Sequence, residues 1–384
     1  MQLKANYMKI LFYKWHSFMN EGIERGLAHL NVEYEPFFYQ LDDWERDDFF
    51  TKQLDSKIEK TKCDYVFSIN YVPLVSNVCE KRGIPYIAWI YDSPIHIRNL
   101  ETLKNDCNQL YFFDRGQVEE YKRLGIEVSY MPLAVDTELW RKKIQQNYNF
   151  VDLLDISFVG QLYETQYGYY MSPLDEYTRG YIEGIINSQG KIYGGYLIPE
   201  LITDALLQKI NLQYKKMVKD DFQIEKRELE FLLACETTRR ERYTALSLLG
   251  KHFNVNWYTE DQKIIPNVTK ESYVDYLTQM PVVFHKSKIN LNMSLKTIRT
   301  GIPMRALDIM GCGGFLLSNY QVELAEYFIE GQECVLYENL EDLYEKCSFY
   351  YSHESIREKI ACAGFEKVKT NFIFENRLKQ IFRL

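Results

Sequence analysis

The chain has 384 residues, which is more than one ordinary domain core holds and suits two. Hydrophobic residues make up 46% and charged residues 26%, as is typical of a globular protein and not of a disordered one. The formal net charge of −8 argues against a nucleic-acid partner held by general attraction to phosphate. A local anion site is still compatible with this charge, because such a site uses a few placed donors.

The cysteines and the apolar runs favour a reducing location. None of the eight cysteines forms a C-x-x-C pair, so the sequence indicates neither a zinc knuckle nor a redox dithiol. The apolar run near the N-terminus is too short for a signal peptide, and no stretch approaches the length of a membrane span. We therefore expect a cytoplasmic protein with no transmembrane segment.

Strands and helices alternate through the first part of the chain. Apolar runs predict strands at 8–13, 64–69, 85–91, 110–113 and 128–131, and helical spacing falls at 20–30, 74–81 and 117–124. Short connections between such elements predict a parallel, doubly wound α/β sheet. Loops at the carboxyl ends of its strands are expected to build the ligand crevice.

A polar stretch at 141–152 marks the predicted end of a first domain, 1–150. A second Rossmann-like domain, 151–370, is expected to follow, with a helical insertion at about 164–250 that includes a long amphipathic helix. A last segment, 371–384, is expected to form a helix that packs back on the first domain. The remaining predicted strands are 155–159, 255–258, 289–293, 315–317 and 334–337, and the closing helices are 340–350, 354–370 and 374–382.

The segment KINLNMSLKTIRTGIPMRALDIMGCGGFLLSN, residues 288–319, is the most informative. Pro303 suits a first helical position, and Gly301 allows close approach to the backbone. The free N–H groups of the helix start then suit a diphosphate, which Arg305 in the first turn can also reach. Asp308, one turn later, can accept the hydroxyls of a ribose. On spacing alone, the alternative that Arg305 and Asp308 form a surface ion pair stays equally open.

The same segment resembles a known family. The motifs that carry the resemblance are KINLN, TGIPMR, DIMGCGGFLLSNYQVEL and HESIREKIACAGFEKV, followed by Arg377. They resemble those of group-1-type glycosyltransferases of the GT-B fold, and most of all the CgeB-like (spore maturation protein) branch. YDSPIH, MPLAVDTELW and DISFVGQLY fit the same bacterial branch. The likeness is strong over about 285–377, moderate over 85–160 and absent in the helical insertion.

The resemblance implies two Rossmann-like domains, the second holding a nucleotide-sugar donor and the first facing a glycan or protein acceptor. It implies no metal and no cofactor, with a UDP-sugar as the expected donor and a hexosyl-type transfer. Asp308 falls at the family's ribose-binding acid, Gly160 at the loop near the donor phosphates and Arg305 at a common basic position. Many relatives carry a glutamate eight residues before the ribose-binding acid, where this chain has Thr300. Thr300 and Gly301 are expected among the donor-binding residues, and Glu323, farther along, is a candidate replacement for the glutamate.

Two side chains in the first domain are candidates for a general base toward an acceptor hydroxyl. His16 follows the first predicted strand, and Asp92 follows the third, with His96 close behind. Strand-end loops favour both residues. Asp92 before Ser93-Pro94 is equally natural as a turn residue, and His16 as a packed or capping one.

Further cations are weaker candidates. Lys288 begins a predicted strand and is expected to contact phosphate. Arg239, Arg240 and Arg242 lie on the long acidic helix, where a solvated, salt-bridged face is the favoured interpretation.

The missing glutamate and the insertion leave two alternatives to a glycosyltransferase. One is a non-catalytic GT-B-like subunit that serves assembly or spore-coat maturation. The other is an epimerase or phosphorylase on the same fold.

Overall fold

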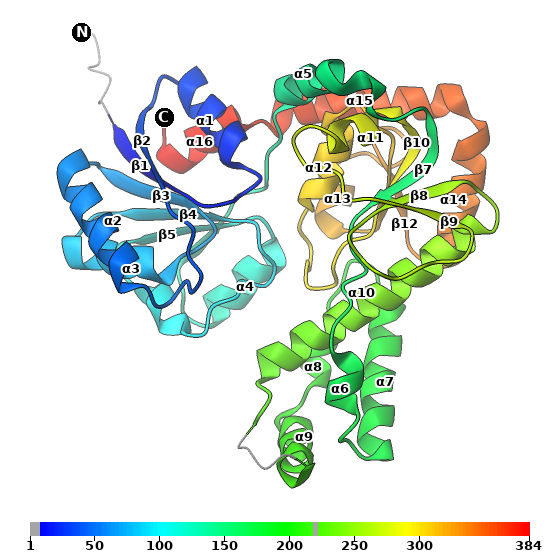
Figure 1. Ribbon diagram of the computed structural model, residues 1–384, viewed down its shortest axis with the longest axis horizontal. Helices are drawn as coiled ribbons and strands as arrows, with labels where there is room; N and C mark the ends of the chain where they lie inside the picture. The colour runs from blue at the N-terminus through cyan, green and yellow to red at the C-terminus, as the bar shows by residue number, and fades with distance from the viewer. Residues whose placement is uncertain (1–7, 218–221) are drawn as a thin grey trace. The chain divides into compact units, whose positions relative to one another are not determined.

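A computed structural model describes residues 8–217 and 222–384 of the chain. Two compact units are present (Figure 1): unit 1 contains the described residues up to Leu139 together with Val368–Leu384, and unit 2 is Trp140–Lys367. The polar stretch at 141–152 that suggested a linker is in large part helix α5 (Thr137–Asn147). Residues 1–7, on which the expectation about a signal peptide partly rested, lie outside the described part.

Unit 1 is built on a six-stranded parallel sheet of order β2-β1-β3-β4-β5-β6. Its strands are β1 (Lys9–Lys14), β2 (Glu33–Phe38), β3 (Tyr65–Ile69), β4 (Tyr86–Ile90), β5 (Asn108–Phe112) and β6 (Val128–Tyr130), and its first helices are α1 (Asn20–His29), α2 (Asp48–Thr61), α3 (Pro73–Arg82), η1 (Leu100–Lys104) and α4 (Arg115–Arg123). The α/β class predicted from the sequence is confirmed. Strand β2 and helix α2 were not predicted from the sequence. Strand β2 reads EYEPFF, with acids and a proline where a central strand would be apolar. Proline is tolerated at this place because β2 is an edge strand.

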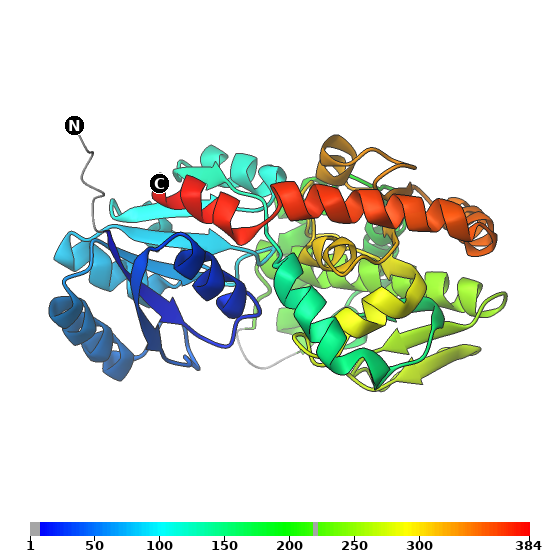
Figure 2. The ribbon, with the colours of Figure 1, turned by 90° about the horizontal axis from the view of Figure 1, so that it is seen from above.

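The chain end returns to unit 1 through α16 (Phe374–Phe382), which packs on α1 (Figure 2). Gly22 and Gly26 face the last helix. A Cβ atom on Gly22 would lie 2.2 Å from the ring of Phe374, and one on Gly26 2.7 Å from Leu378. The absence of side chains at these two positions therefore lets the two helices approach closely. The sequence analysis assigned this return to residues 371–384.

Unit 2 repeats the architecture with a second parallel sheet of order β12-β11-β10-β7-β8-β9. The strands are β7 (Leu154–Val159), β8 (Val255–Tyr258), β9 (Val268–Glu271), β10 (Ser287–Asn292), β11 (Leu316–Asn319) and β12 (Val335–Tyr337); the helices after the insertion are α11 (Met280–Lys286), α12 (Met304–Gly311), α13 (Val322–Tyr327), α14 (Leu340–Ser352) and α15 (Glu354–Asn371). Asn290 in the central strand β10 accepts from Ser157 of β7 at 2.9 Å and donates to the Phe284 carbonyl at 3.0 Å. The bond to Ser157 can form only in one register of β10 against β7, so this buried amide helps to fix that register.

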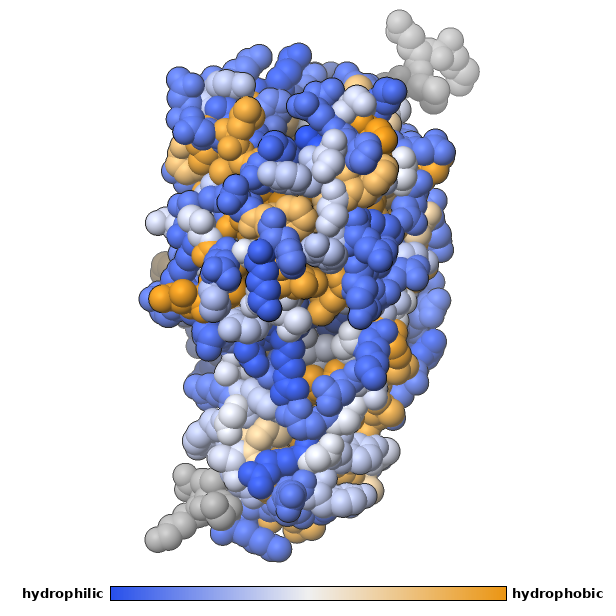
Figure 3. Space-filling view, turned by 90° about the vertical axis from the view of Figure 1, so that its right-hand side faces the viewer, coloured by the Kyte–Doolittle hydropathy of each residue, from blue (hydrophilic) through white to orange (hydrophobic). Residues whose placement is uncertain are grey.

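The predicted insertion is helical where it is described, with α6 (Tyr167–Met171), α7 (Glu176–Gly190), α8 (Ile198–Leu201), α9 (Asp204–Met217) and α10 (Lys226–Gly250). Its helices bury an apolar core of their own, to which Ile182, Ile210 and Leu233 contribute. Farther along, Ala245, Leu246 and Leu249 of α10 join the core under the second sheet. Helix α10 therefore connects the insertion to the sheet of unit 2. On the face shown in Figure 3, apolar residues form patches among hydrophilic ones.

Within the described residues, no helix is both long enough and apolar enough to cross a bilayer.

Candidate functional site

The segment singled out from the sequence forms the start of α12, with one correction. Pro303 has φ −66° and ψ 144°, so it is the extended residue before the helix, and Met304 takes the first helical position. The prediction that Pro303 opens the helix is wrong by one residue, because its extended ψ keeps it outside the turn. Arg305 lies in the first turn as expected. Gly301, Ile302 and Pro303 are buried in unit 2.

Asp308 points into the protein, and this excludes the surface ion pair that spacing left open. Its side chain is 1% exposed, and one oxygen accepts a hydrogen bond of 2.9 Å from the hydroxyl of Tyr276. Burial raises the pKa of Asp308 to about 7, against the opposing effects of Arg305 and of the Tyr276 hydroxyl. Burying a carboxyl group lowers the stability of the fold, and packing could be achieved with an apolar residue instead. Asp308 is therefore a candidate for a functional role.

Arg305 is a half-buried cation that makes no ion pair with the described residues. Its guanidinium lies over the ring of Phe284, 5.5 Å from the ring centroid, and contacts the sulfur of Met280. A guanidinium has five donors, and an aromatic face with a thioether satisfies few of them. Arg305 therefore keeps hydrogen-bonding capacity for an anion near the helix start.

The loop that leads from β10 to α12 is held by Arg242. This residue is buried, and its guanidinium donates to the carbonyl of Met293 (Nε to O, 3.0 Å) and to the carbonyl of Gln161. It thereby joins the loop after β10 to the loop after β7. The favoured interpretation of a solvated face is wrong for Arg242, because its side chain turns inward onto the ring of Tyr163.

The same helix holds the loop at a second point through Lys296. Thr238 accepts from the backbone N–H of Lys296 at 3.1 Å, and Glu241 pairs with its ammonium at 2.6 Å. Both partners of the ion pair are 5% exposed, and the ammonium also lies over the ring of Tyr193. A buried pair of this kind costs desolvation, but it fixes geometry. Helix α10 therefore sets the path of the chain toward Gly301.

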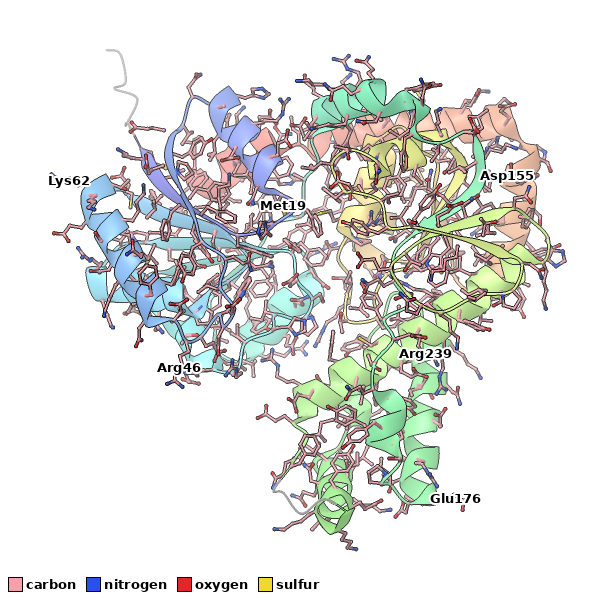
Figure 4. The ribbon with its side chains drawn as sticks, viewed as in Figure 1. Met19, Arg46, Lys62, Asp155, Glu176 and Arg239 are labelled. Atoms are coloured by element: carbon pink, nitrogen blue, oxygen red, sulfur yellow. The ribbon has the colours of Figure 1, made fainter. Side chains whose placement is uncertain are left out.

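Arg239 and Arg240 behave as the sequence suggested. Arg239 pairs with Glu236 at 2.7 Å, and Arg240 pairs with Glu183 at 2.6 Å and with Glu236 at 2.7 Å. The pair of Arg240 with Glu183 connects α10 to α7, and the two pairs with Glu236 lie within α10. Figure 4 labels Arg239 on this helix.

Thr300 and Glu323 form a pair. The Thr300 hydroxyl donates to a carboxylate oxygen of Glu323 at 2.8 Å, and the backbone N–H of Glu323 donates to the Thr300 carbonyl at 2.9 Å. Glu323 is fully buried. The structure therefore places a carboxylate beside the position at which the family's glutamate is missing.

Gly160 lies where β7 ends, at the carboxyl edge of the sheet. Its N–H donates to the carbonyl of Tyr258 at 3.1 Å, so that group continues the sheet. A Cβ atom here would lie 3.2 Å from the ring of Phe158 and 3.6 Å from the guanidinium of Arg242. The tight contact is the one with Phe158, so the glycine gives room for that ring, and Arg242 lies at an ordinary contact distance.

Lys288 does not belong with these residues. It lies at the amino end of β10, where its ammonium pairs with Asp155 at 2.6 Å. Asp155 is at the amino end of the parallel neighbour β7, as Figure 4 shows. Because the two ends of a parallel strand lie at opposite edges of the sheet, the expectation that Lys288 contacts the donor phosphate is wrong.

Unit 1 brings the two candidate bases to the carboxyl edge of its own sheet. His16 is exposed, and its ring packs on that of Phe38 with centroids 5.1 Å apart. Asp92 follows β4 and accepts from the side-chain amide of Asn70 at 2.7 Å. Burial raises the pKa of Asp92 to about 6. The residues just before them, Trp15 and Tyr91, have stacked rings 6.3 Å apart, so the segments after β1 and β4 come together although β3 lies between these two strands. His96, close behind Asp92, is exposed.

Four residues that support this arrangement were not predicted from the sequence: Tyr276, Thr238, Glu241 and Lys296. Tyr276 lies in a loop with no pattern, so only its contact with Asp308 identifies it. Thr238 and Glu241 carried a weak signal, since they are buried positions of the predicted long helix. Lys296 lies in the loop after β10 and carried none. Within the described residues, no group of three or more His, Cys, Asp or Glu is arranged to hold a metal ion.

Comparisons with known proteins agree with this architecture. Residues 226–383 match a family model described as glycosyl transferase-like. Three solved structures are similar over nearly their whole length. They are a glycosyltransferase from Rickettsia africae (TM-score 0.58, 11% identity, 98% of this chain and 97% of that one), the Anabaena protein HepE in complex with UDP-glucose (0.55, 10%, 98% and 98%) and a sucrose-phosphate synthase from Thermosynechococcus elongatus (0.53, 12%, 98% and 98%). At such identities the likeness establishes the fold, which is GT-B, with two Rossmann-like units. No curated protein matches the sequence.

Proposed function

We propose that the protein is a glycosyltransferase that moves a sugar from a nucleoside-diphosphate sugar, with a UDP-sugar as the expected donor, to an acceptor hydroxyl. Two observations support the class: the glycosyl transferase-like match over residues 226–383 and the GT-B fold. The hexosyl nature of the transfer, its independence of metal, the CgeB-like branch and a cytoplasmic location remain predictions from the sequence.

The observation that carries the donor site is the start of α12. The first turn presents backbone N–H groups and the positive end of the helix dipole, and Arg305 lies there without an ion-pair partner among the described residues. We assign the diphosphate to this turn and to Arg305. Asp308, one turn along and buried, is assigned to the ribose hydroxyls, because a carboxylate accepts two hydrogen bonds at once.

The reaction needs a second set of groups at the acceptor. The acceptor oxygen attacks the anomeric carbon, a new C–O bond forms, and the bond from that carbon to the diphosphate oxygen breaks. The nucleoside diphosphate leaves with the electron pair of the broken bond. In an inverting reaction the hydroxyl proton passes to a general base, for which Asp92 is the candidate, since its pKa of about 6 leaves it ionised but more basic than an ordinary carboxylate. His16 is assigned to acceptor binding or to the same proton transfer.

Nucleotide binding tests the donor site directly. Thermal unfolding would be followed with UDP, ADP, GDP and a panel of nucleotide sugars. A nucleotide at a hundred times its Kd adds about 2.7 kcal/mol to the free energy of unfolding. We expect stabilisation by a uridine nucleotide, weakened in Arg305→Ala and Asp308→Ala. Lys288→Ala, at the opposite edge of the sheet, is the matched control and should keep full affinity. If no nucleotide stabilises the protein, the proposal fails.

A second function is favoured by one observation. Gly301, Ile302 and Pro303 are buried, and the Thr300 hydroxyl is bonded to Glu323. A ligand-binding subunit without catalysis, as in an assembly or coat-maturation role, is consistent with a turn closed in this way. Nucleotide affinity without transfer or hydrolysis across the donor panel would favour it, and product analysis would separate an epimerase or a phosphorylase.

A further inference from the structure

Unit 1 carries an aromatic cluster at the carboxyl edge of its sheet, formed by Trp15, Trp44 and Tyr91. Trp15 follows β1, Trp44 lies in the connection from β2 to α2, and Tyr91 follows β4. The ring centroids of Trp15 and Trp44 are 5.1 Å apart, and those of Trp15 and Tyr91 are 6.3 Å apart. All three side chains are partly exposed. Three separate segments therefore bring partly exposed rings to one place.

Further aromatic rings lie on the same segments and face water. Phe18 is 50% exposed, Phe38 53% and Phe49 62%. Phe38 packs on the ring of His16. Exposed rings that gather in one contiguous patch are typical of a binding surface, whereas single ones are common on any protein.

The charge around the aromatic cluster is negative. Residues 39–49, YQLDDWERDDF, contain five acidic side chains and one basic one, Arg46, which Figure 4 labels. Asp43 is paired with Arg98 at 2.7 Å, whereas Asp42 and Asp48 are exposed. An anionic ligand would be repelled here, which disfavours phospholipid surfaces, phosphorylated glycans and nucleic acid.

Hydrogen-bonding groups border the rings. Asn70 donates to Asp92, which lies directly after Tyr91 in the chain. The side-chain carbonyl of Gln40 accepts from the backbone N–H of His16 at 3.2 Å, and its amide carries two N–H groups. Rings flanked by amide and carboxyl groups match a sugar, which offers C–H groups on one face and hydroxyls around its rim.

We propose that the acceptor is a saccharide without negative charge, neutral or amine-bearing, which stacks on the aromatic cluster and directs a hydroxyl toward Asp92. This inference rests on the proposed glycosyltransferase function and names the substrate class that the function leaves open.

Tryptophan fluorescence can report on the cluster selectively. The chain has five tryptophans, and Trp89, Trp140 and Trp257 are buried, so Trp15 and Trp44 are the two within reach of a bound ligand. The intact protein would be titrated with chito-oligosaccharides, their de-acetylated amine-bearing counterparts, oligogalacturonate and phosphatidylglycerol vesicles. We expect a saturable change with the first two and none with the last two.

Variants then localise the binding. Trp44→Ala and Phe38→Ala should each weaken binding about tenfold, as loss of one stacking face does. Phe38 is the safer change for folding because its ring is mostly exposed. Asp42→Asn with Asp48→Asn should weaken the amine-bearing series and leave the neutral one unchanged. Tyr177→Ala, an exposed aromatic residue of the helical insertion, is the matched control and should change nothing.

Each other outcome overturns the inference. It is wrong if neither uncharged nor amine-bearing saccharides alter the fluorescence, if anionic saccharides or vesicles bind equally well, or if Phe38→Ala and Trp44→Ala both bind as the parent does. Nucleotide stabilisation is measured separately and through unit 2. Failure of the saccharide titration with intact nucleotide binding would remove the acceptor class alone, and failure of nucleotide binding would remove the proposed function.

Discussion

The carboxyl edges of the two sheets differ sharply in what they carry, although the sheets are built alike. The edge of unit 1 presents partly exposed aromatic rings and acids, with Asp92 among them. At the edge of unit 2 the polar side chains are mostly buried, among them Asp308, Glu323 and the pair of Lys296 with Glu241. Arg305 there is half-buried and makes no ion pair with the described residues.

The comparison shows that the side-chain chemistry at the carboxyl edge comes from the loops and not from the parallel sheet. Both units have a six-stranded parallel sheet, so the architecture alone gives neither edge its chemistry. Unit 2 adds the helical insertion, and α10 fixes the loop after β10 through Thr238, Glu241 and Arg242. The loop to which we assign the diphosphate is thus held at several points, whereas the edge to which we assign the acceptor is more exposed. Four changes test this contrast, in order of decreasing effect.

Asp92→Asn tests the carboxyl edge of unit 1, which is called the open edge because its aromatic rings are partly exposed. If Asp92 takes the acceptor proton, the transfer rate should fall about a hundredfold or more while nucleotide affinity stays the same. The measurement is a single-turnover transfer assay beside the nucleotide thermal shift. His16→Gln is the companion variant. A parent-like rate in both would contradict a general base at this edge and favour a retaining reaction.

Arg242→Met tests the carboxyl edge of unit 2, which is called the closed edge because its polar side chains are mostly buried. Removing this buried guanidinium leaves the carbonyls of Met293 and Gln161 without their donor, so the free energy of unfolding should fall by about 3 kcal/mol. Urea denaturation measures the loss. Arg240→Met is the matched control on the same helix: its side chain is 34% exposed, and the expected loss is about 1 kcal/mol or less. Equal losses would show that α10 does not hold the loop as described.

The sequence predicted the strands of both sheets better than the side-chain contacts at their carboxyl edges. Apolar runs located nearly all the strands, because buried parallel strands must be apolar on both faces. They missed the two edge strands β2, whose position tolerates Pro36, and β9 (Val268–Glu271), which reads VTKE. Asp308 and Asp92 were identified from their places in motifs and at strand ends. The inward turn of Arg242 and the contact of Tyr276 with Asp308 were out of reach, because each depends on residues distant in sequence. Lys288 was misassigned although it begins a predicted strand, because the amino end of a parallel strand lies at the edge opposite the loops that bind ligands.

Asp308→Asn tests whether ionisation of this buried carboxyl group lowers the stability of the folded protein. The pKa of Asp308 is about 7 in the folded protein and about 4 in an unfolded chain, so the folded state binds the proton more tightly. Stability from this group is complete below the unfolded pKa and is lost as the pH rises through 7, by about 2 kcal/mol between pH 5 and 7. Urea denaturation at several pH values should show this slope in the parent, beside a smaller one from Asp92. Asp308→Asn should remove the Asp308 part while weakening nucleotide binding, and an unchanged slope would contradict the burial of an ionising group.

Tyr276→Phe makes the smallest change and sharpens the same test. The Tyr276 hydroxyl donates to Asp308 and lowers the pKa of that carboxyl, so its removal should move the loss of stability to higher pH. The cost should be about 1 kcal/mol, because the ring keeps its edge contact with Trp140, 5.4 Å between centroids. The same pH series measures both quantities. A midpoint that moves to lower pH would mean that the hydroxyl bonds the neutral acid. Asp308 would then be held for stability and not as an acceptor for ribose hydroxyls, and the contrast between a closed donor edge and an open acceptor edge would lose its chemical basis.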